Sequence, residues 1–191
     1  MILGKTTTSE FGWTGVSRSP LTGITHNPWK HGMNAGASSA GAGAASAAGF
    51  GPLHQGSDGA GSIRMPSHFC GIFGLKPTFG RVPYYPVSVG DMTSHMGPMT
   101  RTVADSALFL ECMAGPHHLD YTTLEAGPAA YLKRLHEGVK GKRIAYSPDL
   151  GHARVDPEVA AAVAASAIRW ATVDVTPPAS HADTAPDGLP A

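Results

Sequence analysis

A run of very small residues near the start of the chain limits the available folds more than any other feature. Residues 35–51 read AGASSAGAGAASAAGFG, in which Phe50 is the one side chain larger than serine. This composition is typical of a flexible linker, or of a helix packed so closely that nothing larger than alanine fits. Patterned sequence follows at once (GPLHQGSDGAGSIRMPSHFCGIFGLKP), which favours the helix. We predict a packed helix with Ser39 capping its start.

Strand and helix patterns alternate along the rest of the chain. Thr102, with Asp105 three residues later, predicts a capped helix that Gly115-Pro116 stops. Asp156-Pro157-Glu158 predicts the start of another helix. The alternation predicts an α/β fold. Three further elements are expected: a short buried strand over residues 70–75, an amphipathic helix over 129–136 and a strand over 142–147.

Composition argues against several classes of protein. The 14 Lys and Arg residues balance the 14 Asp and Glu residues, so bulk charge gives no nucleic-acid-binding surface. Cys70 and Cys112 form no CxxC motif and are too few for a disulfide scaffold, so both are expected to be free thiols in a reducing compartment. No apolar stretch is long enough for a membrane span or a signal peptide. The expected location is the cytoplasm.

Two other kinds of site find little support in the residues. Gly4-Lys5-Thr6 resembles the tail of a P-loop, but the glycine that must precede it by five positions is absent from the chain. The ten histidines are scattered, and His117-His118 is the one adjacent pair. Adjacent side chains rarely chelate one metal ion together. We therefore expect neither a metal nor an organic cofactor.

Two serines 24 residues apart stand in glycine-rich motifs. Ser38 lies in GASSAG and Ser62 in GSDGAGSIRMP, and CGIFGLKPT follows. Together these motifs resemble the amidase signature family, which includes the amidase subunit of glutamyl-tRNA(Gln) amidotransferase. The resemblance covers most of the chain and implies a partial amidase-signature domain over residues 1–175, truncated at both ends. Its fold would be α/β, with a mixed twisted sheet flanked by helices, and residues 176–191 would form a loop or disordered tail.

The resemblance also implies a Ser–Ser–Lys triad that hydrolyses amides. Ser62 matches the nucleophile, and Ser38 matches the bridging serine, which in the family follows a cis peptide bond. An amide carbonyl is a poor electrophile, so the hydroxyl must be activated by a base, and the second serine can relay its proton. The backbone N–H groups of the glycine-rich loop match the oxyanion hole: Gly59, Ala60, Gly61 and Ser62. Three side chains are expected to support that loop: Asp58, Ser39 and Arg64.

The family's final base is a lysine whose matching position falls before Met1. Lys5, Lys30 and Lys76 match other positions, so the chain alone is expected to be inactive. Two interpretations remain open: an amidase that needs residues outside this chain, or a catalytically dead remnant that acts as a binding fragment. Alanines stand where the family has glycines, at positions 37, 40 and 60. They predict strain wherever a positive φ is required.

The expected partners follow from these points. The substrate would be a small-molecule amide, and neither nucleic acid nor membrane is expected to bind. Uncovered sheet edges and apolar faces predict poor solubility, self-association or a complementing amidase fragment.

Overall fold

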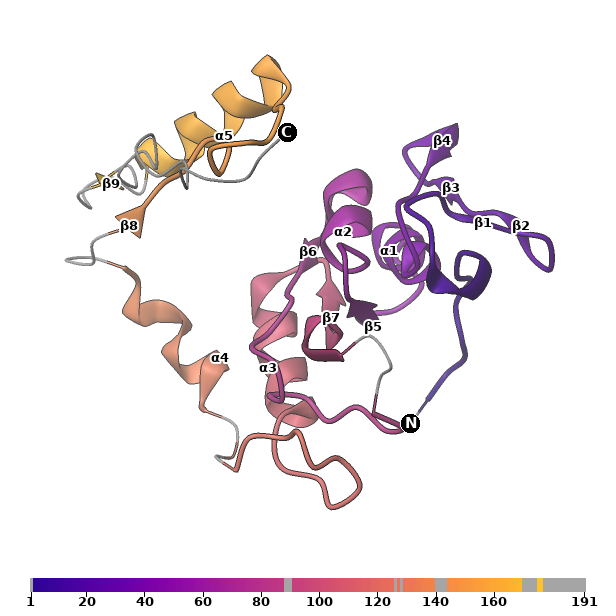
Figure 1. Ribbon diagram of the computed structural model, residues 1–191, viewed down its shortest axis with the longest axis vertical. Helices are drawn as coiled ribbons and strands as arrows, with labels where there is room; N and C mark the ends of the chain where they lie inside the picture. The colour runs from indigo at the N-terminus through magenta and orange to yellow at the C-terminus, as the bar shows by residue number, and fades with distance from the viewer. Residues whose placement is uncertain are drawn as a thin grey trace, which may run out of the picture. The chain divides into compact units, whose positions relative to one another are not determined.

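The structure is a computed structural model that describes residues 2–87, 91–125, 127, 129–139, 144–169 and 175–176. The chain divides into two compact units, Met1–His136 and Glu137–Ala191. Every residue with an expected catalytic role belongs to the first unit (Figure 1).

The first unit opens with short loop-borne elements. A 3-10 turn, η1 (Glu10–Gly12), is followed by two antiparallel strand pairs. These pairs are β1 (Arg18–Ser19) with β2 (Gly23–Ile24), and β3 (His26–Asn27) with β4 (Lys30–Asn34).

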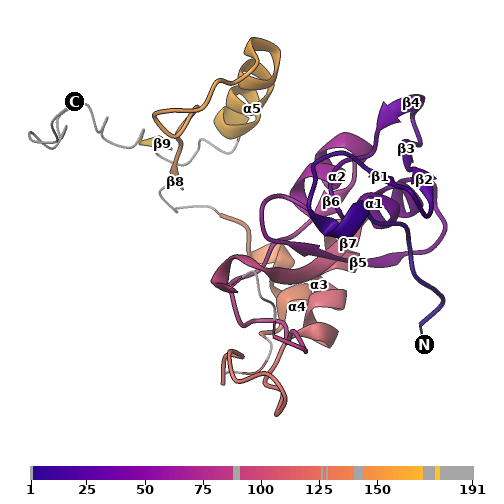
Figure 2. The same ribbon diagram turned by 45° about the vertical axis from the view of Figure 1, so that its right-hand side comes forward.

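A three-stranded antiparallel sheet forms the centre of the first unit, in the order β5 (Leu53–Asp58), β7 (His95–Thr100) and β6 (Phe73–Gly74). A 3-10 turn, η2 (Asp91–Thr93), precedes β7. Figure 2 shows α1 (Ala40–Ala47) and α2 (Arg64–Cys70) on one side of the sheet and α3 (Val103–Met113) on the other. Because both faces are covered, β7 is buried from Gly97 to Thr100. The predicted α/β class is confirmed.

Helix α1 confirms the packed helix predicted from the small-residue run. A Cβ built on Gly43 would stand 2.9 Å from the Cβ of Pro66 in α2, and one on Gly41 would overlap the backbone of Thr7. Ala42, on the buried side of α1, packs against Ile63 and Met99. The absence of larger side chains thus lets α1 approach α2 and the sheet closely.

Ser39 stands at the N-cap position of α1, but its predicted capping bond is wrong. Its Oγ accepts from the Ser57 N–H at 3.2 Å and donates to the Ser57 carbonyl at 3.3 Å. The hydroxyl therefore satisfies the backbone of strand β5 rather than the start of its own helix.

The strand predicted over residues 70–75 is reduced to Phe73–Gly74, and the helix before it was missed. The end of α2 is held by two side chains from the β3–β4 hairpin. Asn27 Nδ2 donates to the Phe69 carbonyl at 2.6 Å, and Trp29 Nε1 donates to the Cys70 carbonyl at 2.7 Å. These bonds occupy carbonyls that a helix end leaves without partners. The partners lie about 40 residues away in the sequence, so local patterns do not reveal them.

The capped helix predicted after Thr102 is confirmed as α3. The Asp105 N–H donates to Thr102 Oγ1 at 3.0 Å, and the hydroxyl donates to the Asp105 carboxylate at 2.7 Å. The helix expected over residues 129–136 is shorter, with α4 (Tyr131–Arg134) running into a 3-10 turn, η3 (Leu135–Glu137).

The second unit contains α5 (Pro157–Arg169) and a parallel pair, β8 (Ile144–Ala145) with β9 (Val175–Thr176). The helix predicted from Asp156 is confirmed, because the Asp156 carboxylate accepts from the Glu158 N–H at 2.9 Å. The strand predicted over residues 142–147 is found at residues 144–145, and residues 142–143 lie outside the described residues. So does the predicted tail beyond Thr176. No helix in the described ranges is both long and apolar enough to cross a bilayer.

Gly43→Ala should lower the free energy of unfolding by up to about 2 kcal/mol. Alanine gains roughly 1 kcal/mol over glycine in a helix, but overpacking against the rigid Pro66 ring costs about 1–3 kcal/mol. Urea unfolding followed by circular dichroism measures the change. Gly4→Ala is the matched control, because nothing lies within 4 Å of the added methyl group. A gain in stability for Gly43→Ala would contradict the close packing of α1.

Candidate active site

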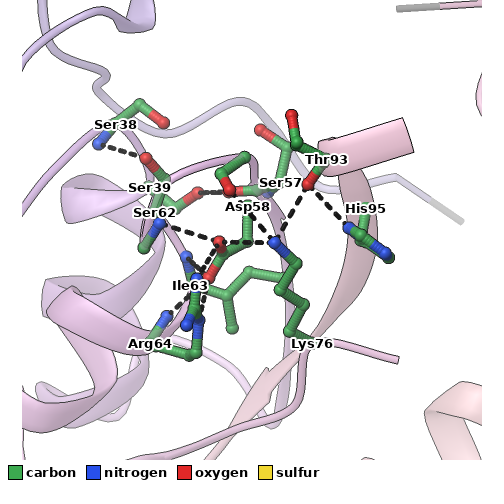
Figure 3. A network of polar contacts seen from close by, with 12 residues as sticks. Ser38, Ser39, Ser57, Asp58, Ser62, Ile63, Arg64, Lys76, Thr93 and His95 are labelled. Atoms are coloured by element: carbon green, nitrogen blue, oxygen red, sulfur yellow. Dashed lines mark hydrogen bonds and ion pairs between the residues drawn. The ribbon is translucent and has the colours of Figure 1, made fainter. Parts of the chain in front are cut away.

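The loop between β5 and α2 is organised around the carboxylate of Asp58. The Asp58 side chain is fully buried at the end of β5. Its Oδ1 accepts from the Gly61 N–H at 2.8 Å, and its Oδ2 accepts from the N–H groups of Ile63 and Arg64, both at 3.1 Å (Figure 3). Hydrogen bonds to this one side chain therefore fix the backbone conformation of residues 59–64.

Two cations complete the surroundings of Asp58. Arg64 donates from Nε to Oδ2 at 3.0 Å and from Nη2 to Oδ1 at 2.9 Å, and Lys76 Nζ lies 3.3 Å from Oδ1. Burial raises the pKa of Asp58, but the hydrogen bonds from the Arg64 side chain and from the backbone N–H groups outweigh it. The net effect holds the pKa well below its usual range. The carboxylate is thus ionised wherever the protein is folded near neutral pH.

Ser38 and Ser62 meet at the surface of this loop. The Ser38 N–H donates to Ser62 Oγ across 3.3 Å, although the two residues are 24 positions apart. Ser38 lies just before α1, and Ser62 lies just before α2. Close packing of the two helices accounts for the meeting. Within the described residues, no hydrogen bond joins the two hydroxyl groups.

The peptide bond before Ser38 is trans, whereas the resemblance implied a cis bond. The turn into Ser38 is made instead by two successive residues with positive φ, Gly36 at 92° and Ala37 at 24°. Of the three alanines that stand for family glycines, Ala37 is the one with a positive φ. The predicted strain is therefore found at position 37 and not at positions 40 or 60.

The four N–H groups expected to form the oxyanion hole differ in their partners. The Gly61 N–H is occupied by Asp58. In the described part of the chain, those of Gly59, Ala60 and Ser62 have no acceptor. They can donate to a ligand oxygen, and they lie in the same loop as Ser62 Oγ.

The sequence motifs did not indicate a role for Asn34, which lies at the end of β4. Its Oδ1 accepts from the N–H groups of Ser17 at 3.1 Å and Gly36 at 2.9 Å, and its Nδ2 donates to the Gly15 carbonyl at 3.1 Å. The side chain thus ties the segment leading into Ser38 to the N-terminal loop. Asparagine two residues before glycine is a turn signal that could have indicated the bond to Gly36, but not those to the distant loop.

Lys76 also reaches the loop, from the segment after β6. Its Nζ donates to the Gly59 carbonyl at 3.1 Å and to the Thr93 carbonyl at 2.9 Å. The sequence indicated that Lys76 is not part of the triad and predicted no other role for it. As an ammonium group it has an oxygen acceptor for each of its three donors.

Metal ligands do not gather in the described ranges, where no group of three or more His, Cys, Asp or Glu side chains could hold an ion. Cys70 is buried, and burial raises the pKa of its thiol to about 11. Cys70 is therefore poorly suited to act as a nucleophile near neutral pH.

Comparisons with known proteins agree with this arrangement of motifs. The sequence profile of the amidase family matches residues 1–179. The chain belongs to the amidase family. Among curated members, it is 52% identical over 163 residues to an acylamidase of Rhodococcus erythropolis. The aligned region covers 84% of this chain and 34% of the acylamidase. It is 40% identical over 164 residues to a glutamyl-tRNA(Gln) amidotransferase subunit of Gloeobacter violaceus, covering 85% and 34% of the two chains.

Solved structures of the amidase family share the fold. A bacterial aryl acylamidase of the amidase signature family superposes with a TM-score of 0.80 at 31% identity, covering 88% of this chain and 35% of the other. The chain therefore spans about a third of the length of the amidases it matches.

Asp58→Asn should lower the free energy of unfolding at pH 7 by about 2–4 kcal/mol, because it leaves buried donors and cations without a full acceptor. The pH profile should change too. The folded pKa is depressed, so the carboxylate stabilises the fold above the unfolded value of about 3.9 and loses this effect as pH falls below it.

Urea unfolding at pH 7, 5 and 3.5 measures both effects. The decline between pH 5 and 3.5 should be smaller in Asp58→Asn than in the wild type. Asp105→Asn, at the start of α3, removes a carboxylate outside the Asp58 cluster and serves as the control. Equal declines in the wild type and Asp58→Asn would contradict the ionised state assigned to Asp58.

Ala37→Gly should raise the free energy of unfolding by up to about 1.6 kcal/mol. Relief of roughly 1–2 kcal/mol of strain at a positive φ is partly offset by the greater freedom of glycine in the unfolded chain, about 0.4–1 kcal/mol. Ala45→Gly, inside α1, makes the same chemical change without that strain and should lose about 1 kcal/mol. Thermal and urea unfolding would show whether the two variants move in opposite directions.

Proposed function

We propose that the chain supplies the nucleophile of an amidase and that Ser62 forms an acyl-enzyme with an amide substrate. The observation that carries the proposal is the meeting of Ser62 Oγ with Ser38 beside a loop whose N–H groups at Gly59, Ala60 and Ser62 lack acceptors within the described residues. Membership of the amidase family supports amide hydrolysis as the reaction.

In the proposed reaction, Ser62 Oγ attacks the substrate carbonyl carbon while its proton passes to Ser38 and on to a base. The carbonyl oxygen becomes an oxyanion, which the available N–H groups of the loop stabilise. One such donor contributes roughly 3–4 kcal/mol to transition-state stabilisation. When the C–N bond breaks, the leaving nitrogen takes the proton and departs as an amine or ammonia. Water then hydrolyses the Ser62 ester and regenerates the hydroxyl.

The final base in this proposal is a lysine outside the chain. Lys76 does not take its place, because its ammonium group is directed at Asp58, Gly59 and Thr93. We therefore propose that the chain alone turns over amides poorly, and that activity needs a polypeptide carrying the base. Large apolar side chains are available to pack against such a partner, with Phe11 94%, Trp13 90% and Leu21 91% exposed.

The proposed substrate class is a small acyl amide. Support comes from the activities for which the matched proteins are named, since the acylamidase is 52% identical and the amidotransferase subunit 40% identical. The formal net charge of the chain is zero, which gives no support for contact with tRNA.

A catalytically dead remnant is the second candidate function. The trans bond at Ala37–Ser38 and the missing hydrogen bond between the two hydroxyls favour it, because proton relay needs those oxygens in contact. A remnant of this kind could bind an amide through the loop N–H groups without cleaving it.

A fluorophosphonate probe separates the two candidates, because it reacts with an activated serine and not with an ordinary one. The full chain is incubated with the probe alone, and again with the upstream segment of the Rhodococcus erythropolis acylamidase. Mass spectrometry of peptides locates the adduct. We expect slow labelling at Ser62 that is accelerated by the added segment, is absent in Ser62→Ala and is slowed about 10–100-fold in Ser38→Ala.

The controls decide the interpretation. The same acylamidase segment, with the lysine at the position that the family resemblance implies for the base replaced, should give no acceleration. Absence of any Ser62 adduct in both mixtures would favour the dead remnant, and labelling at another serine would overturn the assignment of Ser62.

A further inference from the structure

Lys76 meets the proposed oxyanion loop because of how the sheet is ordered. Strands β5 and β6 both run antiparallel to β7, so the chain leaves both in the direction of the start of β7. Strand β5 ends opposite His95, and β6 ends opposite Met99. The loop after β5 and the segment after β6 therefore lie on either side of the start of β7. Figure 3 shows the Lys76 side chain extended from its segment toward Asp58 and Thr93.

The backbone beside Lys76 is fixed by close packing on β7. The Leu75 N–H donates to the Pro98 carbonyl at 3.1 Å. A Cβ added to Gly97 would overlap the Leu75 carbonyl oxygen, so the segment lies directly on a strand position that only glycine permits. The backbone next to Lys76 is thus held against β7. The Lys76 side chain is 19% exposed.

The contact that matters for the loop is the one between Lys76 Nζ and the Gly59 carbonyl, at 3.1 Å. This carbonyl belongs to the peptide group that also carries the Ala60 N–H. A trans peptide is planar, and its C=O and N–H point in opposite directions. By holding the oxygen on one side, Lys76 directs the Ala60 N–H to the other side, where no described residue accepts it.

The other contacts of the ammonium group connect this peptide to its surroundings. One donor reaches Asp58, which folds the rest of the loop, and one reaches the Thr93 carbonyl in η2. The His95 Nδ1 also lies 2.7 Å from that carbonyl. The ammonium group thus has three acceptors on two segments, Asp58 and Gly59 in one and Thr93 in the other, which fix it more firmly than one acceptor would.

We propose that Lys76 is a positioning residue that aims the Ala60 N–H at the oxyanion, rather than a base or a simple structural ion pair. The inference rests on the proposed function for the oxyanion, but the aim of the peptide group is a property of the loop itself. Asp58 already occupies the Gly61 N–H. The Ala60 N–H receives no such bond from Asp58, and Lys76 holds the carbonyl of its peptide group.

The test compares Lys76→Met, which keeps the stem and removes the ammonium group, with Lys76→Arg, which keeps the charge and donors. Lys30→Met is the control, at an exposed lysine on β4. Backbone ¹⁵N relaxation of the full chain reads the order parameter of each amide. In Lys76→Met the Ala60 order parameter should fall from about 0.85 to below about 0.6, while those of Gly61 and Ile63 stay unchanged. Lys76→Arg should restore much of the order at Ala60.

A kinetic readout on the same proteins separates positioning from substrate or probe binding. With the fluorophosphonate and the acylamidase segment, Lys76→Met should lower the maximal rate of Ser62 labelling about 10–100-fold and leave the half-saturating probe concentration unchanged. Lys30→Met should match the wild type in both readouts.

The outcomes distinguish this inference from the proposed function. An Ala60 amide that stays rigid in Lys76→Met would overturn the inference, as would equal loosening of the Asp58-bound amides together with a lower melting temperature. Loosening confined to Ala60 without any labelling of wild-type Ser62 would support the role of Lys76 in the loop and overturn Ser62 as the nucleophile.

Discussion

The buried carboxylate of Asp58 is the interaction on which the candidate site depends. A charge fully removed from water is unfavourable unless donors surround it, and Asp58 has three backbone N–H groups, a bidentate arginine and a lysine. These partners come from the loop, from the start of α2 and from the segment after β6. Satisfying one charge therefore determines the shape of the loop, the direction from which α2 begins and the position of Ser62. The loop can keep other N–H groups available because its conformation is already fixed by those that are paired.

Close packing of small residues is the second constraint, and it applies at the contact between α1 and α2 rather than at Asp58. Gly43 lets α1 lie against Pro66 of α2, and this brings the segment before α1 next to the segment before α2. Ser38 and Ser62 stand at those two positions. The two constraints are complementary. Asp58 fixes the loop that carries Ser62, and the packing of α1 against α2 places Ser38 next to Ser62. Neither would bring the serines together without the other.

The sequence predicted features that depend on local chemistry and missed those that depend on distant contacts. The small-residue helix, the Thr102 cap and the Asp156 cap follow from patterns within a few residues, and the structure has them. The end of α2 depends on Asn27 and Trp29, and the segment before Ser38 depends on Asn34 and Gly15. The Ser39 hydroxyl bonds to the β5 backbone instead of its own helix, because the unpaired edge of that strand lies within reach. The site residues were named from motifs, but the partners that orient them could come only from the fold.

The geometry at Ser38 bears on the proposed proton relay. A proton relay requires the Ser38 oxygen to face Ser62, whereas here the backbone N–H of Ser38 faces it. An N–H donor at Ser62 Oγ stabilises negative charge on that oxygen but cannot take its proton. In this arrangement the loop has N–H groups without acceptors among the described residues, while the two hydroxyl oxygens that the proposed relay needs are not hydrogen-bonded to each other. The contacts that shape the loop all lie inside the first unit. In the proposed function, binding of the substrate carbonyl and activation of the nucleophile therefore depend on different contacts.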